Sequence, residues 1–203
     1  MVESNDTRST ERPDSEGTTM TRTRALRAAA AAAVAAVASL ALVAPAYAES
    51  VTVKDGADAS GSLNDILDVT ADHRGAKLVV TVSVADLRPT SEGGPASMAL
   101  YVDTDPSRRG PEFRLGTGLQ SGTDFQLVRM SGWKVTGDPL TCRHRVALDN
   151  AGDEVRFTIA RPCLRRPDQV RIGVKMVDQF DGSHPITDWL KHRRAFTRWL
   201  DRA

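Results

Sequence analysis

The sequence predicts an all-β fold, an antiparallel β-sandwich of about seven to nine strands, on the basis of two observations. Beyond residue 48, apolar and polar residues alternate with a period of two, which is typical of strands with one buried and one solvated face. Turn-forming residues separate these runs at short intervals, and no long helical segments alternate with them as a parallel sheet would require. The chain from residue 49 onward is long enough for one domain with a single core.

The N-terminal part of the chain is expected to lie outside this domain. Residues 1–19 are polar and lack periodicity, so we expect either a disordered segment or a true start of translation at Met20. Residues 20–48 have a basic start, an alanine-rich apolar run and an Ala-Tyr-Ala ending, which together are typical of a secretory signal peptide. The alternative is an alanine-rich helix of the domain itself. The apolar run is short for a membrane span, so residues 49–203 are predicted to form one secreted domain without a membrane segment.

Nine runs of alternating residues are the expected strands. In chain order they are Val51–Val53, Leu67–Ala71, Leu78–Val84, Met98–Val102, Phe113–Leu115, Phe125–Met130, His144–Leu148, Val155–Ile159 and Val170–Met176. The tail from Thr187 changes period, because its aromatic and leucine residues recur near helical spacing. A short amphipathic helix with Thr187 as its N-cap is the first choice there, and an extended strand over 196–200 is the alternative.

The two cysteines, Cys142 and Cys163, both fall in the predicted exported part. An isolated pair in an oxidising compartment is most simply one disulfide, and two free thiols are the alternative. The runs 144–148 and 155–159, which lie between the two cysteines, are expected to form a hairpin. If Leu148 faces Glu154 in it, Cys142 lies opposite Ala160 and a bridge would close the open end of the hairpin. Closing this loop should stabilise the fold by about 3 kcal/mol.

Charge is balanced in the predicted mature chain, which has 22 Lys and Arg against 21 Asp and Glu, a net charge of +1. Charges of both signs are scattered along the chain rather than gathered in runs. This pattern argues against nucleic acid or a charged membrane surface as a partner.

The segment from Met98 to Leu115 carries acidic groups from a buried strand into a loop. Asp103 and Asp105 lie two residues apart, and Glu112 and Asp124 would lie nearby if the following strands pair alongside. Calcium prefers carboxylate and carbonyl oxygens in such loops, so these four residues are the candidate metal ligands. Alternatively, two of the carboxylates act as a general acid and base. The simpler alternative is that both aspartates accept hydrogen bonds from loop N–H groups in Asx turns.

Aromatic residues are few in the mature chain, and Tyr101 and Trp133 are the two expected to face outward as ligand-binding residues. No cofactor is expected other than possible calcium. Haem would need an accessible His or Met pair, and the available side chains suit the core: Met98, Met130, Met176 and His144.

Two blocks of the sequence resemble a group of uncharacterised small secreted actinobacterial proteins. The first is Tyr101-Val-Asp-Thr-Asp-Pro with Gly110-Pro-Glu-Phe-Arg-Leu, and the second is Arg161-Pro-Cys-Leu with Val170-Arg-Ile-Gly-Val. The resemblance covers most of the mature chain and implies no function. More distantly, the strand running into Asp-x-Asp is similar to the sandwich of DOMON domains and family 9 carbohydrate-binding modules, which bind haem or sugars.

These observations favour a secreted, non-enzymatic binding module whose partner is an extracellular ligand or a component of the cell envelope. The sequence contains a scaffold, but no nucleophile elbow, zinc motif or phosphate-binding glycine loop. The alternatives are an extracellular hydrolase that uses the Asp-x-Asp loop and a structural cell-envelope protein.

Overall fold

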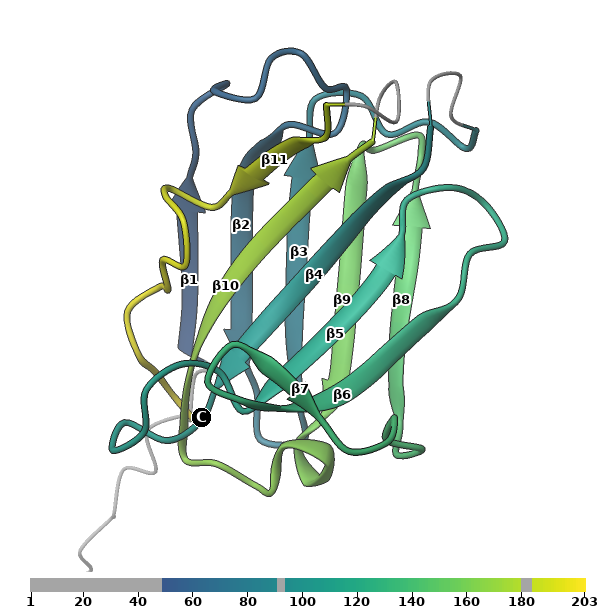
Figure 1. Cartoon of the computed structure of the whole chain (residues 1–203). Helices are drawn as coiled ribbons and strands as arrows, with labels where there is room; N and C mark the ends of the chain where they lie inside the picture. The colour runs from purple at the N-terminus through teal and green to yellow at the C-terminus, as the bar shows by residue number, and fades with distance from the viewer. Residues whose placement is uncertain (1–48, 91–93, 180–183) are drawn as a thin grey trace, which may run out of the picture. The chain divides into compact units, whose positions relative to one another are not determined.

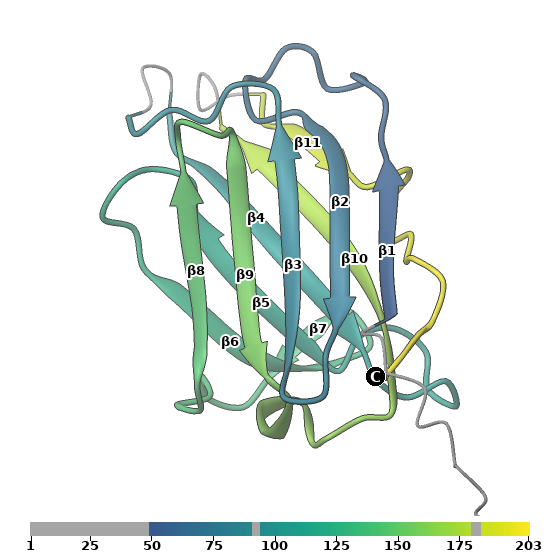
Figure 2. The ribbon, with the colours of Figure 1, turned by 180° about the vertical axis from the view of Figure 1, so that it is seen from behind.

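The computed structural model describes residues 49–90, 94–179 and 184–203, which form two antiparallel β-sheets (Figure 1). The strands of one sheet run obliquely across those of the other, as the opposite views in Figures 1 and 2 show. The predicted all-β sandwich is confirmed. The predicted start and signal peptide lie outside the described residues.

The first sheet has five strands. In spatial order they are β1 (Glu49–Lys54), β2 (Ile66–His73), β3 (Lys77–Val84), β9 (Glu154–Ala160) and β8 (His144–Asp149). The second sheet has seven strands, six of them in one continuous order. These are β11 (Ile186–Trp189), β10 (Gln169–Asp178), β4 (Ala96–Asp103), β5 (Phe113–Gly118), β6 (Phe125–Ser131) and β7 (Lys134–Thr136), and β12 (Leu200–Asp201) also pairs with β10. A short 3-10 helix, η1 (Arg161–Leu164), leads out of β9.

One core fills the space between the sheets, because the long strands turn alternate apolar residues inward. The largest buried side chains include Phe113 of β5 and Phe157 of β9. Met98 and Met176 are buried in this core as predicted, with exposed fractions of 1% and 0%. Within the described ranges, no helix has the length and apolar character needed to cross a membrane.

The structure corrects three local predictions. The described strands number twelve because β7, β11 and β12 were not predicted, and each has four residues or fewer. A bulge between Ile66 and Asp68 shifts the alternation of β2, so Ile66 rather than Leu67 is fully buried. The predicted helix from Thr187 is wrong, since this part of the chain is extended where it pairs with β10.

The hairpin of β8 and β9 forms with a register one residue away from the expected one. Leu148 faces Val155 rather than Glu154, and His144 faces Ile159. His144 is half-buried rather than buried, and its Nδ1 lies 2.6 Å from the carbonyl oxygen of Cys142.

The predicted disulfide between Cys142 and Cys163 is confirmed, with the two Cα atoms 5.8 Å apart. Cys142 precedes β8, and Cys163 lies in η1, immediately after β9. The bridge therefore closes the open end of this hairpin.

Replacing both Cys142 and Cys163 by Ser should lower the free energy of unfolding by about 3 kcal/mol, because the unfolded chain regains the freedom of the closed loop. The sequence separation of 21 residues sets this magnitude. Urea unfolding of the double variant against oxidised wild type measures it. Equal unfolding midpoints would contradict a stabilising bridge.

Candidate functional site

The C-terminal tail, residues 184–203, runs antiparallel along β10 but leaves it in the middle. Trp189 pairs with Lys175, and Leu200 pairs with Val170. Between these pairs the tail has ten residues (190–199) where β10 has four (171–174), so six extra residues bulge outward. We call residues 191–196 the tail loop.

The tail loop lies on the outer face of the seven-stranded sheet, the face turned away from the core. Gly173 of β10 makes this possible, since a Cβ there would lie 2.6 Å from the carbonyl oxygen of Ala195. The tail returns to β10 at Thr197, whose N–H donates to the carbonyl of Ile172 at 2.8 Å. The Oγ1 of Thr197 accepts the Ile172 N–H at 3.1 Å. These contacts fix both the place where the loop ends and its distance from the sheet.

Four aromatic rings form a cluster between the tail and the outer face. The Tyr101 ring lies 5.0 Å from that of Trp133 and stacks at 5.6 Å on that of Trp189. Trp133 also contacts Trp189 at 5.6 Å and Phe196 of the tail loop at 5.5 Å. Tyr101 is nearly buried by these neighbours, whereas the other three rings are half-exposed.

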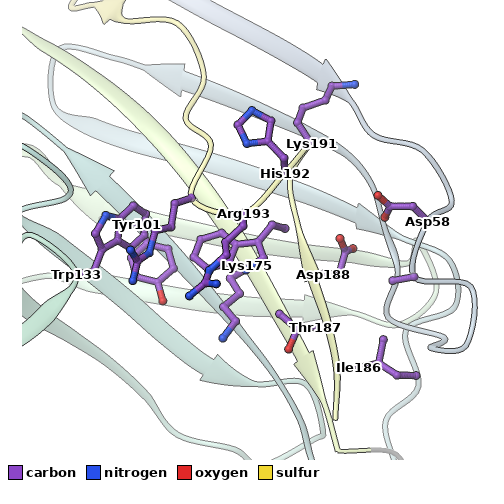
Figure 3. A pocket seen from close by; sticks show the side chains of 13 residues that line it. Asp58, Tyr101, Trp133, Lys175, Ile186, Thr187, Asp188, Lys191, His192 and Arg193 are labelled. Carbon is purple, nitrogen blue, oxygen red and sulfur yellow. The ribbon is translucent and has the colours of Figure 1, made fainter. Parts of the chain in front are cut away.

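A hollow of about 740 Å³ lies beside this cluster, and we call it the outer-face hollow (Figure 3). Tyr101 and Trp133 lie at one end, and Asp58 and Asp188 lie toward the other. Lys175 rises from β10 between the two ends. The hollow therefore joins an aromatic end to an acidic end.

Basic side chains surround the aromatic end. The Lys175 ammonium lies 5.6 Å from the centre of the Trp189 ring, and the Arg194 guanidinium lies 5.0 Å from that of Trp133. Burial lowers the pKa of Lys175, and the positive charges of Arg114 and Arg193 lower it further. These groups give the aromatic end a positive potential.

At the acidic end, Asp58 and Asp188 line the hollow and Asp65 lies beside them, and carboxylate oxygens of all three lie within 4.8 Å of one another. Asp188 accepts the N–H of Ile66 at 2.8 Å, and Asp65 accepts that of Ala59 at 2.9 Å. Burial raises the pKa of Asp188 to about 6, and the neighbouring carboxylates add to this effect. This spacing could hold a divalent cation, but the same groups also serve as hydrogen-bond acceptors that hold the loop before β2.

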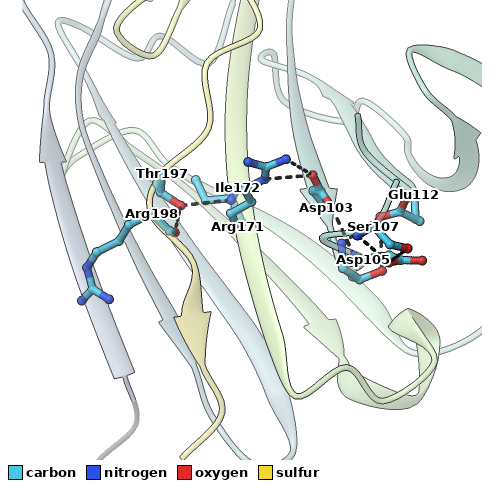
Figure 4. Close-up of polar contacts among 9 residues, drawn as sticks. Asp103, Asp105, Ser107, Glu112, Arg171, Ile172, Thr197 and Arg198 are labelled. Atoms are coloured by element: carbon cyan, nitrogen blue, oxygen red, sulfur yellow. Dashed lines mark hydrogen bonds and ion pairs between the residues drawn. The ribbon is translucent and has the colours of Figure 1, made fainter. Parts of the chain in front are cut away.

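The structure places Asp103 in an ion pair (Figure 4). Its side chain is fully buried, and its Oδ2 accepts bonds from Nε and Nη2 of Arg171 at 2.8 and 2.6 Å. The Arg171 guanidinium also lies 4.8 Å from the ring centre of Phe196 and 4.7 Å from that of Trp199. Since the carboxylate is covered and paired, Asp103 is poorly placed for the general acid or base of the hydrolase alternative.

Asp105 and Glu112 lie near Asp103 and act mainly on the loop backbone. The N–H of Asp105 donates to Asp103 at 3.2 Å, and Asp105 in turn accepts the N–H of Ser107 at 3.0 Å (Figure 4). Both aspartates therefore accept the loop hydrogen bonds expected of Asx turns. Glu112 accepts the N–H of Thr104 at 2.8 Å, and burial raises the pKa of Glu112.

Asp124 does not join the other three predicted calcium ligands. It precedes β6, whose first residue, Phe125, pairs with Thr117, whereas Asp103 follows the pair of Val102 with Phe113 at the opposite end of β5. The following strands do pair alongside, but the length of β5 separates Asp124 from the other three carboxylates. Calcium at the remaining three carboxylates stays a prediction.

Tyr101 and Trp133, the predicted ligand-binding aromatic residues, are brought together by the fold. Sequence reasoning missed Trp189, Phe196 and the basic residues of the tail loop as their neighbours. The available signal was the clustering of basic residues between two tryptophans at 189–199. The sequence alone suggests no ligand for these residues, because paired arginines such as Arg193 and Arg194 are most simply solvated loop charges.

Replacing Arg171 by Ala should lower the free energy of unfolding by about 3 kcal/mol, because it leaves the buried Asp103 carboxylate unpaired. Arg171→Lys should cost less, since it keeps the charge but loses the two-bond geometry. Urea unfolding measures both changes. The control is Arg156→Ala, which breaks an exposed pair with Glu154 and should cost at most about 1 kcal/mol. Equal losses for Arg171→Ala and Arg156→Ala would contradict this role.

Asp188→Asn should gain stability relative to wild type as the pH rises from 4 to 7. The raised pKa means that the folded protein binds a proton more tightly than the unfolded chain, so wild type loses stability as the pH rises through about 6. The gain should be roughly 1–3 kcal/mol, at 1.36 kcal/mol per pKa unit. Urea unfolding at several pH values measures it.

The quantity to compare is the difference in free energy of unfolding between Asp188→Asn and wild type at each pH, since other groups also titrate in this range. The raised pKa of Glu112 gives a slope of the same sign, and the lowered pKa of buried His73 gives the opposite slope. Asp124→Asn, at an exposed carboxylate, is the matched control and should leave the pH profile unchanged. A pH profile for Asp188→Asn parallel to that of wild type would refute the assignment.

Comparisons with known proteins assign this chain to no family. No protein-family model matches the chain, and no curated protein matches it.

Proposed function

We propose that this protein is a secreted binding module that holds the ring of a carbohydrate in the outer-face hollow. The N-terminal sequence supports export, and the Cys142–Cys163 disulfide is compatible with an oxidising compartment. Sugar rings have apolar faces that pack on aromatic rings, and polar edges that hydrogen-bond to the surrounding side chains.

The observation that carries the proposal is the grouping of Tyr101, Trp133 and Trp189 beside a hollow on a sheet. Tyr101 comes from a central strand and Trp189 from β11, while Trp133 sits in the turn between β6 and β7. Core packing alone does not require this set, since the residues lie on the outer face and the two tryptophans remain half-exposed. Because Tyr101 and Trp189 lie on strands and Trp133 packs against both rings, this surface loses little conformational freedom when a ligand binds.

Polar groups around the hollow could orient such a ligand. Lys175 and Thr187 come from the sheet, and His192 comes from the tail loop, so donors and acceptors line the hollow between its aromatic and acidic ends (Figure 3). A few polar groups placed around an apolar surface are the usual composition of a small-ligand site.

Affinity electrophoresis of the mature protein through gels containing soluble polysaccharides, both neutral and acidic, tests the proposal. At least one polysaccharide should retard wild type, and Trp133→Ala or Trp189→Ala should weaken the interaction by at least about tenfold, or 1.4 kcal/mol. Binding of the matching oligosaccharide should also change tryptophan fluorescence, since two of the three tryptophans lie at the hollow.

Phe125→Ala is the matched control. Its ring is exposed and contacts His144 near β8, away from the hollow, so its loss should leave affinity unchanged. Melting temperatures show whether each variant is folded. The proposal fails if no polysaccharide retards wild type, or if folded Trp133→Ala and Trp189→Ala bind as well as Phe125→Ala does.

A further inference from the structure

The basic residues at the outer-face hollow form no ion pair with an acidic residue that the structure describes. Within the described part of the chain, no ion pair involves Lys175, Arg193 or Arg194, nor the neighbouring Arg114. Elsewhere on the described surface some cations are paired, for example Lys54 with Asp68 at 2.9 Å, and others, such as Lys77 and Arg145, are not. What distinguishes the hollow is that several unpaired cations gather there, at a concave site beside aromatic rings.

The fold holds these cations close to one another. Lys175 pairs with Ala99, and Arg114 of β5 pairs with the neighbouring Tyr101, so both side chains project from the outer face beside the aromatic rings. Arg193 reaches the same place from the tail loop and lies next to Lys175 (Figure 3). Their mutual repulsion contributes to the lowered pKa of Lys175. An anion bound among them would relieve that repulsion.

The distribution of charge along the hollow also indicates how an anionic ligand would be oriented in it. Four cations line it, namely Lys175, Lys191, Arg193 and Arg194, against the two carboxylates of Asp58 and Asp188. The carboxylates lie toward the end away from the aromatic rings (Figure 3). An anionic group would therefore be repelled at that end and attracted at the aromatic end.

We propose that the ligand of the outer-face hollow is an acidic sugar, whose ring packs on the aromatic cluster while its carboxylate or phosphate lies among Lys175, Arg193 and Arg114. This inference rests on the proposed function and specifies its substrate class. Carboxylate and phosphate share the chemistry that the site recognises, namely anionic oxygens carried on a ring or chain that can reach the cations. A neutral sugar would leave the cations without partners and gain only the ring contact.

Isothermal titration of the mature protein with three kinds of oligosaccharide tests the inference. The probes are an oligogalacturonate for carboxylate, an oligomer of glycerol phosphate bearing sugar substituents for phosphate, and a cello-oligosaccharide as the neutral counterpart. At least one acidic probe should bind at least tenfold more tightly than the neutral one. Its affinity should fall between 50 and 500 mM NaCl, since salt screens exposed charges. Comparing the two acidic probes identifies the source of the anion.

Lys175→Gln and Arg193→Gln should each weaken binding of the acidic probe by at least tenfold and leave the neutral probe unaffected. Lys77→Gln and Arg145→Gln are the matched controls, because they remove the same charge from the five-stranded sheet, and they should change affinity less than twofold. Arg193 is exposed on the tail loop, so its variant tests the site even if Lys175→Gln unfolds.

The two proposals fail in different ways. Equal affinity for neutral and acidic probes, or equal losses in the site and control variants, overturns the acidic-sugar inference. If Trp133→Ala still weakens binding of the neutral probe in that case, the proposed carbohydrate-binding function stands. Absence of binding to all three probes and to the polysaccharides overturns both.

Discussion

The outer face of this protein depends on the ion pair between Arg171 and Asp103. Asp103 ends β4 as a buried carboxylate, and Arg171 of β10 meets it with two hydrogen bonds. The guanidinium also lies against the rings of Phe196 and Trp199, so the charge that neutralises Asp103 is the same group on which the tail packs. One side chain thus joins the neighbouring strands β4 and β10 to the tail that packs against them.

The tail in turn gives the sheet a concave surface that regular strands would not have. A single strand paired along the whole of β10, in place of β11 and β12, would extend the sheet and leave its outer face flat. The six-residue excursion instead places backbone above Gly173 and raises a wall of basic side chains beside Tyr101. The irregularity of the pairing is therefore what creates the outer-face hollow, in the way that bulges often redirect side chains near functional sites.

Period-two alternation was sufficient to predict the long strands and to place Tyr101 and Asp103 on the same outward side of β4. It could not predict the tail, because residues 191–196 leave β10 and break the alternation between two short paired segments. The resulting spacing of Trp189 and Phe196 resembles that of two residues on the same face of a helix. The partner of Asp103 was also beyond sequence reasoning, since Arg171 is 68 residues away and only the pairing of β4 with β10 brings it near.

The tail, which forms one wall of the hollow, is also fixed to the five-stranded sheet. This attachment affects how the hollow binds a ligand. At the start of the tail, Asp188 accepts the Ile66 N–H of β2, and the N–H of Lys191 donates to Asp55 at 3.0 Å. Near its end, the carbonyl of Leu200 lies 3.1 Å from Nδ1 of buried His73, which as the neutral ring can donate to it. A tail held at both ends to β2 and its flanking loop, and in its middle by Arg171, has little freedom left to lose when a ligand enters. The affinity of the hollow should therefore depend on ring contact and charge rather than on ordering of the loop.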